Sequence, residues 1–421
     1  MKVFKFGGAS VKDAASVKNV ATILSEYKNE KLFVVISAMG KTTNALEEFT
    51  NSLYHDLQTA KKILDKIKSY HFEILNELFK DTNHIVFNEI HNAFVELDWM
   101  LDESPTQPYD QTYDQVVSLG EILSTKIISH FLNYIGVNNT WIDVRDFMRT
   151  DNNYREAKVD WNTTQSLFDS NLDSYFKEAL ICITQGFIGG TSENFTTTLG
   201  REGSDYTASI IAYLCNAEQV TIWKDVAGVM NADPKKFNDA VLIPHLTYHD
   251  AVELTYYGAT VIHPKTIKPI QNKHIPLYVR SFIHYHETGT EINDTIAQHV
   301  QACFIHKPDQ LLLSLSGKDF SFIVEDSISK IFSVLASLRI KVNLMQNSAL
   351  SFSICIDNFS KKNILIDMLS SDFFVRYNEG IDLYTIRHYN QKAIEKIMLG
   401  KEVLLEQRSR NTLQLVVKKS D

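Results

Sequence analysis

The chain has 421 residues, a formal net charge of −9 and 44% hydrophobic residues. With only 16 glycines and 8 prolines, its composition excludes the collagen-like, low-complexity and disordered classes. The length allows two or three domains with a sizeable core, and the negative charge argues against nucleic acid as the main partner.

The chain opens with a pattern typical of a β-α-β unit. Residues 2–6 and 31–37 are apolar runs of strand length, and residues 11–27 between them have helical spacing. Residues 45–103 are charged, helical in pattern and free of glycine and proline. We therefore expect a helical insertion over about residues 45–110, with a loop at 104–111.

Strands and helices continue to alternate as far as residue 223. We expect strands at 137–144, 180–187 and 219–223, and helices at 116–132 and 205–214. Buried strands that alternate with helices predict an α/β fold with a mostly parallel sheet sandwiched by helices.

The pattern changes near residue 300, where we place a domain boundary between residues 1–300 and 301–421. Short strands are predicted at 311–315, 351–356, 373–377, 382–387, 401–407 and 413–418. Helices are predicted at 328–338, 361–369 and 391–398. These repeated small units indicate an α+β region with antiparallel pairing.

The cysteines and the N-terminus bear on cellular location. Cys182 and Cys355 lie in apolar runs, Cys215 and Cys303 are isolated, and no CxxC pair occurs, so we expect core thiols rather than disulfides. The first residues lack the apolar stretch of a signal peptide, and no run of about 18 apolar residues occurs. We expect a cytoplasmic protein.

The first segment with chemical potential is KFGGAS at residues 5–10, at the end of the first strand. Gly7 and Gly8 let backbone N–H groups approach an anion, Lys5 adds a positive charge, and Ser10 can cap or bind. The segment is neither a P-loop nor a GxGxxG motif, and an ordinary strand-helix turn is the alternative.

Two further segments lie where an α/β sheet binds ligands. SAMGKTTN at residues 37–44 places small and hydroxyl residues, including Thr43, after the second strand. SLGE at residues 118–121 ends in Glu121, for which a solvated glutamate is the alternative.

The segment GREGSDYTA at residues 200–208 has the highest density of such features. Arg201 is suited to bidentate carboxylate binding, and Asp205 stands at a helix start. The alternatives are a surface arginine and a helix N-cap.

Two later segments complete the set, WKDVAGVMNADPKK at residues 223–236 and GATVIHPKT at 258–266. His263 precedes a proline and is most simply a packed turn histidine. A metal site from His245, His249 and His263 has no matching motif, so we predict no metal ligands from the protein. Together the segments indicate an ATP-type phosphate site beside a site for a small carboxylate, and hence phosphoryl transfer.

These six motifs occur in an order and spacing that strongly resemble aspartate kinase (aspartokinase) of the amino-acid kinase superfamily, over nearly the whole chain. The resemblance implies transfer of the ATP γ-phosphoryl group, with Mg²⁺, to the side-chain carboxylate of L-aspartate. The product would be 4-phospho-L-aspartate, the first step toward lysine, threonine and methionine. No dehydrogenase segment is present, so we expect the monofunctional form.

The resemblance also implies roles for single residues. Lys5, Arg201 and Asp205 would be catalytic, with Arg201 pairing with the substrate carboxylate and Glu121 accepting from its ammonium. The substrate-binding set would be Thr43, Glu121, Arg201, Glu202, Gly203 and Ser204. The nucleotide-binding set would be Lys5, Phe6, Gly7, Gly8, Ser10, Lys224, Asp225, Met230, Lys235, Thr260 and Val261.

Some positions depart from the family pattern. Glu202 stands where the family commonly has glycine, and we expect its side chain to face away from the anionic substrates. Lys224, Met230, Lys235 and Thr260 also differ from the residues common in the family, and they concern the nucleotide contacts rather than the reaction.

The C-terminal part resembles the family's ACT-type regulatory region, with a second unit that looks abbreviated. Asn343, Met345 and Ser348 lie on the segment that resembles its effector site. The resemblance implies feedback by lysine or threonine and a homodimer formed through this region. From the negative charge and the lack of a long apolar run we expect no nucleic-acid or membrane partner.

Two alternatives stay open from the residues. The first is another amino-acid kinase that acts on glutamate, acetylglutamate or UMP. The second is a non-catalytic amino-acid-binding regulatory protein that uses the ACT-like region.

Overall fold

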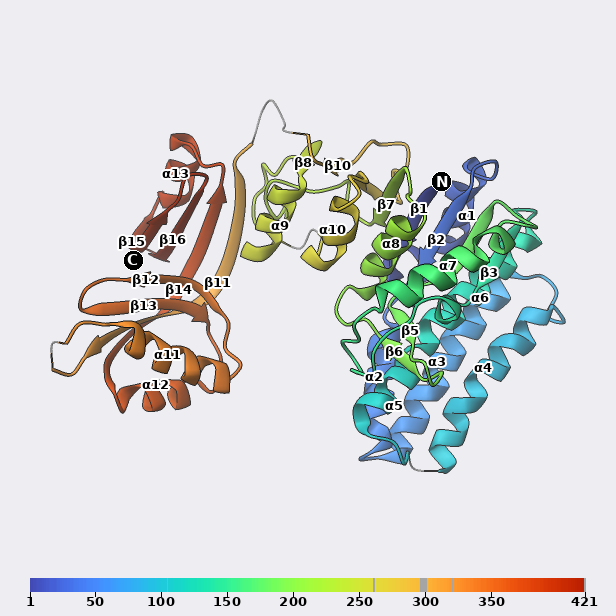
Figure 1. The fold of residues 1–421 in the computed structure, drawn as a ribbon, viewed down its shortest axis with the longest axis horizontal. Coiled ribbons are helices and arrows are strands. Elements are labelled where there is room, and N and C mark those ends of the chain that lie inside the picture. Colours follow the sequence, from blue (N-terminus) through green and yellow to red (C-terminus); the bar gives the residue numbers. More distant parts are fainter. Residues whose placement is uncertain (104, 260–261, 296–300, 320, 420–421) are drawn as a thin grey trace. The chain divides into compact units, whose positions relative to one another are not determined.

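The computed structural model describes residues 1–421 except 104, 260–261, 296–300, 320 and 420–421. Its contacts divide the chain into two compact units. The first comprises Met1–Val229, Leu242–Val252 and Ile262–Ile296, and the second comprises Met230–Val241, Glu253–Val261 and Ala297–Asp421. Figure 1 shows the fold of each unit.

The first unit is built on an eight-stranded sheet with the order β3-β4-β2-β1-β7-β9-β10-β8. All pairings in it are parallel except that of β9 with β10. The strands are β1 (Lys2–Phe6), β2 (Leu32–Ile36), β3 (Asn139–Ile142), β4 (Ile181–Gln185), β7 (Gln219–Lys224), β8 (His245–Thr247), β9 (Leu277–Ser281) and β10 (Thr290–Asn293). A small hairpin pairs β5 (Ile188–Gly190) with β6 (Thr196–Thr198).

Helices cover this sheet, as expected for an α/β fold. They are α1 (Ala14–Glu26), α2 (Thr42–Leu53), α3 (Leu57–Leu78), α4 (Ile85–Asp102), α5 (Tyr109–Val117), α6 (Leu119–Tyr134), α7 (Trp161–Tyr175), α8 (Gly203–Leu214), α9 (Tyr248–Tyr257) and α10 (Pro264–Gln271). Helix α9 has its first residues in the first unit and its last in the second. The predicted α/β fold with a mostly parallel sheet is confirmed.

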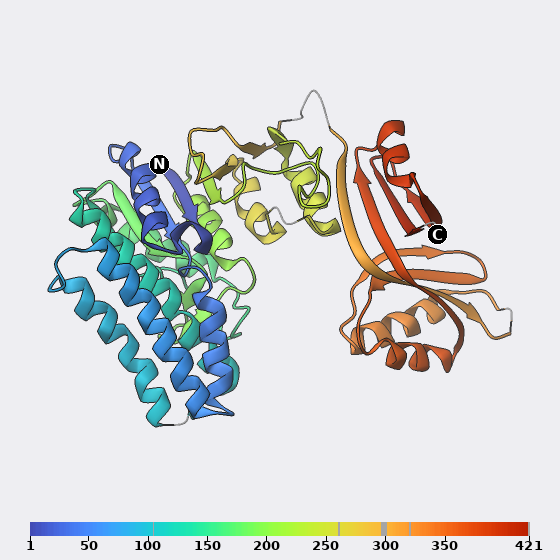
Figure 2. The same cartoon turned by 180° about the vertical axis from the view of Figure 1, so that it is seen from behind.

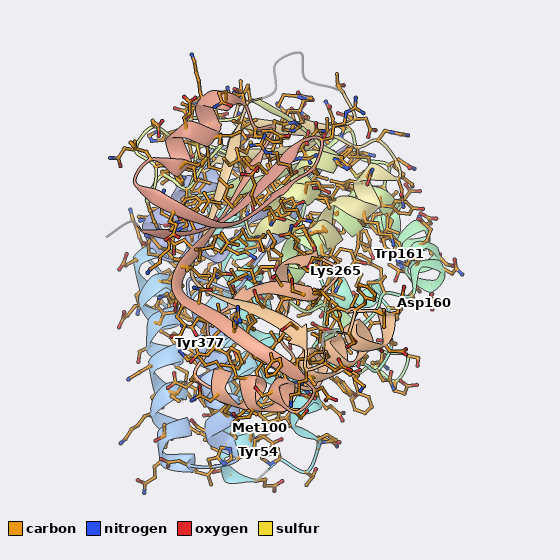
Figure 3. All side chains as sticks on the ribbon, turned by 90° about the vertical axis from the view of Figure 1, so that its left-hand side faces the viewer. Tyr54, Met100, Asp160, Trp161, Lys265 and Tyr377 are labelled. Atoms are coloured by element: carbon orange, nitrogen blue, oxygen red, sulfur yellow. The ribbon has the colours of Figure 1, made fainter. Side chains whose placement is uncertain are left out.

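The long helices α3 and α4 lie side by side, and α4 also contacts α6 (Figures 1 and 2). Tyr54, just after α2, and Met100 near the end of α4 are labelled on this bundle in Figure 3. Apolar side chains on its inner faces join the sheet in one core that includes Ile63, Leu75 and Phe94.

Two local predictions in this region are wrong. The loop expected at 104–111 ends earlier, because α5 begins at Tyr109 behind Pro108, whose φ of −55° suits a helix start. The single helix expected at 116–132 is interrupted at Ser118, which separates α5 from α6.

The sequence pattern also missed several elements, among them α7, α9 and α10. Helix α7 carries a clear start signal, since the Asp160 side chain accepts from the backbone N–H groups of Asn162 and Thr163. Asp160 and Trp161 mark this helix start in Figure 3.

The second unit holds a six-stranded antiparallel sheet with the order β12-β13-β11-β14-β16-β15. The strands are β11 (Cys303–Gly317), β12 (Val342–Asn347), β13 (Ser351–Asp357), β14 (Phe373–Arg387), β15 (Lys401–Arg408) and β16 (Thr412–Lys419). Among the described residues, α11 (Glu325–Ser337) and α12 (Lys362–Ser370) pack beside β11 and β13, and α13 (Gln391–Met398) packs beside β14 and β16. Figure 2 shows α11 and α12 together on one part of this sheet.

The separate strands expected at 373–377 and 382–387 are one strand, β14, and the strand expected at 311–315 is part of the longer β11. The two long strands stay paired through two register shifts, between Lys307 and Gln310 and between Gln310 and Leu312. Gly380 on β14 lies beside the second shift and has a φ of +65°. These irregularities let β14 pair with β11 along both halves of the sheet.

Within the described part of the chain, no helix is both long and apolar enough to cross a bilayer.

Candidate active site

The parallel strands β1, β2 and β7 end at Phe6, Ile36 and Lys224, on one edge of the sheet of the first unit. A cavity of about 820 Å³ lies there. Its lining includes Lys5, Gly7, Gly8, Ser10, Thr43, Glu121, Arg201, Glu202, Gly203, Ser204, Asp205, Lys224 and Asp225. The structure therefore brings together thirteen of the predicted site residues.

Lys5 and Asp205 form an ion pair inside this cavity. The Nζ of Lys5 on β1 lies 2.6 Å from Oδ1 of Asp205 on α8, and the side chains are only 11% and 5% exposed. The buried ammonium of Lys5, held in place by a carboxylate, is suited to neutralising the negative charge on a group that is transferred beside it.

The glycines after β1 allow the backbone to approach the next strand's loop. A Cβ on Gly8 would lie 2.7 Å from the carbonyl oxygen of Gly40 and 2.8 Å from that of Ala38. The N–H of Gly40 donates to the carbonyl oxygen of Gly8 at 3.0 Å. A side chain at position 8 would collide with the loop after β2, so only glycine fits there. Residues of the loop after β1 and of the loop after β2 both line the cavity.

Glu121 is buried at the start of α6, with an exposed fraction of 2%. Its Oε1 accepts from the N–H of Ala38 at 3.3 Å, and its Oε2 has no hydrogen-bond partner among the described residues. Burial raises the pKa of this carboxyl to about 8. Glu121 is therefore no solvated glutamate, and its free oxygen suits a ligand ammonium.

The start of α8 carries the other predicted substrate residues. Arg201 is exposed, whereas Ser204 and Asp205 are buried. Gly203 packs so closely that an added Cβ would lie 2.7 Å from the ring of Phe187. Glu202 has a φ of +55°, and its Oε2 accepts from the N–H of His263 at 3.1 Å.

That bond holds the Glu202 carboxylate at the start of α10, and Glu202 also lines the cavity, so its facing away from anionic substrates stays a prediction. His263 caps α10, because its Nδ1 accepts from the N–H of Lys265 at 3.2 Å. Lys265, labelled in Figure 3, in turn donates to the carbonyl oxygen of Leu199 at 2.9 Å. His263 is thus the turn histidine that its proline predicts.

The predicted nucleotide residues divide into groups. Lys224 and Asp225 line the cavity, but the ring of Phe6 is buried and stacks on Trp223 with 5.9 Å between centroids. Met230 and Lys235 belong to the second unit and are not among the residues that line this cavity. Thr260 and Val261 lie outside the described residues.

Sequence reasoning missed Arg155, which also lines the cavity. It is a non-glycine residue with a φ of +69°, and its guanidinium lies 4.4 Å from the ring centroid of Tyr113. It pairs with Asp110 at 3.4 Å and with Glu47 at 3.8 Å. A backbone strain of this kind at a cavity wall is typical of functional positions.

A buried carboxylate holds this arginine in place. Asp114 accepts from the N–H of Arg155 at 3.0 Å, and from the N–H and hydroxyl of Thr198 at 2.8 and 2.7 Å. Burial raises the pKa of Asp114 to about 6. Asp114 lies on α5, seven residues before Glu121 on α6, and this proximity to a predicted site residue is the signal that could have drawn attention to it.

In the second unit, the residues that resemble an effector site lie on and after the edge strand β12. The Asn343 side chain donates to Gln310 and Asp357, both at 2.8 Å, and accepts from Lys307 at 2.7 Å. Met345 is 52% exposed, and Ser348 bonds to Ser351 across the turn to β13.

The remaining candidates have structural explanations. Cys182, Cys303 and Cys355 are buried, Cys215 is partly buried, and no disulfide joins any two of these four cysteines. Among the described residues, no group of three or more histidine, cysteine, aspartate or glutamate side chains could hold a metal ion. His245 bonds through Nε2 to Asn293 at 2.8 Å instead.

The comparison with protein families decides the assignment. Residues 1–281 match the model of the amino acid kinase family. The chain belongs to this family. The match to a family of kinases agrees with the phosphate site that we expected from the segments KFGGAS and GREGSDYTA.

Curated relatives refine this membership. The chain is 32% identical to lysine-sensitive aspartokinase 3 of Escherichia coli, over 84% of this chain and 78% of the relative. It is 31% identical to chloroplastic aspartokinase 1 of Arabidopsis thaliana, over 84% of this chain and 63% of the relative. For a chloroplastic bifunctional aspartokinase/homoserine dehydrogenase 1 of Zea mays, 29% identity extends over 90% of this chain but only 42% of the relative. The chain thus spans less than two thirds of the length of several of its relatives.

Solved structures agree with this result. E. coli aspartokinase III in complex with lysine and aspartate superposes with a TM-score of 0.85 at 27% identity, over 99% of this chain and 96% of that one. The complex of the same enzyme with aspartate and ADP gives a TM-score of 0.81, with the same coverage. The resemblance to aspartokinases is confirmed in both sequence and fold.

Proposed function

We propose that the chain is an aspartate kinase that transfers the γ-phosphoryl group of ATP to the side-chain carboxylate of L-aspartate. The observation that carries this proposal is the cavity that joins the Lys5–Asp205 ion pair to Glu121 and Arg201. The first pair suits a transferring phosphoryl group, and the second pair suits the ammonium and the carboxylate of an amino acid.

The reaction needs little covalent help from the protein. A side-chain carboxylate oxygen of aspartate attacks the γ-phosphorus, the bond from this phosphorus to the bridging oxygen breaks, and ADP leaves. No proton moves in this step, so catalysis rests on position and charge. Lys5 and the N–H groups after β1 stabilise the charge on the phosphoryl oxygens, and Mg²⁺ enters with ATP as part of the substrate.

Glu121 and Arg201 would orient the amino acid. Glu121 accepts from the α-ammonium through its free Oε2, Arg201 pairs with the α-carboxylate, and Thr43 lines the same wall. This leaves the side-chain carboxylate toward Lys5. These residue types suit aspartate and ADP, with which E. coli aspartokinase III has been crystallised.

The substrate is tested by ADP release with a panel of acceptors. We expect turnover with L-aspartate and at least about 100-fold lower kcat/KM with L-glutamate, because one added methylene moves the reacting carboxylate away from Lys5. Acetylglutamate and UMP should give background rates. Turnover with glutamate and none with aspartate would replace this proposal by another kinase of the family.

The role of Lys5 is tested by Lys5→Ala. We expect kcat to fall by about 100-fold or more, because the transferring charge loses its buried cation. Lys2→Ala is the matched control, since Lys2 lies on the same strand but pairs with Glu30 at 2.6 Å, away from the cavity. Retained turnover in Lys5→Ala would refute the catalytic role.

We also propose that the chain forms a homodimer through the second unit. Strand β12 is an edge of its sheet, and Met345 on it is 52% exposed. Edges of this kind favour pairing with another strand. Light scattering should give twice the chain mass of 48.1 kDa, and a monomer at micromolar concentration would contradict the proposal.

A further inference from the structure

The loop that carries Arg201 is held by the first turn of α10. Both segments belong to the first unit, and α10 packs against α8, which begins directly after this loop. Two side chains connect the turn to the loop, those of Glu202 and Lys265. The reaction steps proposed above use neither of them.

The first connection is made by Glu202. This residue stands at the N-cap position of α8 but does not cap that helix with its side chain. Its Oε2 instead accepts from the N–H of His263, the N-cap of α10, at 3.1 Å, where the helix dipole favours a carboxylate. Its backbone is left-handed, with a φ of +55°. Glycine would adopt this backbone with less strain, so the side-chain contact is what a glutamate adds here.

The second connection is made by Lys265. Its Nζ donates to the carbonyl oxygen of Leu199 at 2.9 Å and lies 5.2 Å from the ring centroid of Tyr206 on α8. The N–H of Leu199 donates to the carbonyl oxygen of Phe187 at 2.8 Å, and the Leu199 side chain is fully buried. The backbone of the loop is therefore fixed at Leu199 from two sides.

The two connections flank Arg201 along the chain. Leu199 lies two residues before it, and Glu202 follows it directly. Arg201 itself is exposed and lines the kinase cavity. A long exposed side chain loses rotamer freedom when it binds a ligand, and a backbone fixed on both sides of it limits the further loss.

We propose that Glu202 and Lys265 are positioning residues, which hold Arg201 where it receives the α-carboxylate of L-aspartate. This inference rests on the proposed function and adds two residues that act through Arg201. The predicted nucleotide residues Lys5 and Lys224 lie on the central strands β1 and β7. Loss of either connection should therefore weaken the use of aspartate and leave that of ATP nearly unchanged.

The test is steady-state kinetics of the full chain with L-aspartate and ATP. Glu202→Gly removes the bond to His263 and also relieves the left-handed backbone, so the variant should fold. We expect its KM for L-aspartate to rise by about fivefold or more, with kcat and the KM for ATP within about twofold of the wild type. Lys265→Met keeps the length of the side chain without its donor and should act in the same direction.

Two further variants separate positioning from charge and from general disturbance of α10. Glu202→Gln keeps an acceptor for the N–H of His263 but removes a negative charge from the cavity wall. Because this loss of charge by itself favours anionic substrates, its KM for L-aspartate should equal or fall below that of the wild type. Lys268→Met, an exposed lysine on the same helix, should leave all constants unchanged.

An unchanged KM for L-aspartate in both Glu202→Gly and Lys265→Met would overturn the inference. An equal rise in Glu202→Gln and Glu202→Gly, or a parallel rise in the KM for ATP, would also overturn it. Thermal unfolding shows which variants are folded, and if one is not, the other carries the comparison. The wild type alone tests the proposed function: if it has no turnover with L-aspartate, that function and this inference fail together.

Discussion

At the residue scale, Glu121 is the group whose protonation should change most directly when the substrate binds. Its pKa of about 8, raised by burial, means that the empty site holds mainly the neutral acid at pH 7. An ammonium beside Oε2 favours the carboxylate. We therefore expect L-aspartate binding at pH 7 to release close to one proton, and affinity to rise with pH up to about 8.

This release is measured by calorimetry in buffers of different ionisation enthalpy. Glu121→Gln should bind aspartate more weakly and release no proton at pH 7. Proton release that is equal in wild type and Glu121→Gln would contradict the assigned contact. Without substrate, the raised pKa of Glu121 makes the free energy of unfolding depend on pH. Its contribution to stability is present at low pH and is lost as pH rises from about 4.5 through 8.

Asp114 acts through the groups that it holds. Asp114→Asn replaces an acceptor by a donor opposite the N–H of Arg155 and Thr198, so we expect a loss of about 1–3 kcal/mol in the free energy of unfolding. KM for aspartate should also rise, because both partners line the cavity. Urea denaturation and steady-state kinetics measure the two effects.

Asp110→Asn is the matched control for this prediction. Asp110 pairs with the same arginine at 3.4 Å, but its side chain is 59% exposed, and exposed pairs contribute little. A change of at most about 0.5 kcal/mol is expected. Similar losses in the two variants would show that burial of Asp114 is not what matters.

At the scale of the element, Gly7 and Gly8 in the loop after β1 differ in how much space a side chain would have. Gly8→Ala would place a Cβ 2.7 Å from a carbonyl oxygen of the backbone, so we expect a loss of roughly 1–3 kcal/mol in stability together with loss of activity. Gly7 has a φ of −80°, and a Cβ there would meet only the flexible Lys5 ammonium at 3.4 Å.

Gly7→Ala should therefore fold like the wild type. Thermal unfolding of the two variants makes the comparison. An unchanged midpoint in Gly8→Ala would contradict the close approach of the two loops.

The elements that the sequence predicted best are those with a strong local signal, either a continuous apolar run or helical spacing. The strands β1 and β2 and the helix α13 match their predicted ranges within a residue or so. Helix α8 was predicted from its apolar spacing, and its first turn carries the predicted Asp205. These signals are local, so each element can be predicted from its own segment of the sequence.

The sequence could not predict what depends on distant contacts. The joining of 373–377 and 382–387 into β14 depends on pairing with β11, and the place of Arg155 depends on Asp114 from α5. Neither partner is near in sequence. The predicted contacts of Met230 and Lys235 with the nucleotide likewise depend on long-range placement, and they stay predictions.

At the scale of the whole molecule, feedback is the property expected of the second unit. E. coli aspartokinase III, which shares this fold, has been crystallised in complex with lysine and aspartate. We expect L-lysine to lower the initial rate at subsaturating aspartate, because an effector that prefers one conformation shifts the population toward it. A flat response to both lysine and threonine would contradict feedback through this unit.

The central claim is that aspartate receives the phosphoryl group on its side-chain carboxylate. Hydroxylamine traps an acyl phosphate as a hydroxamate, so the full chain is incubated with ATP, Mg²⁺, L-aspartate and hydroxylamine. We predict ATP-dependent formation of β-aspartyl hydroxamate in the wild type, and a rate lower by about 100-fold or more in Lys5→Ala. Absence of the hydroxamate from a folded wild-type chain, or its formation at equal rate in both proteins, would contradict the claim.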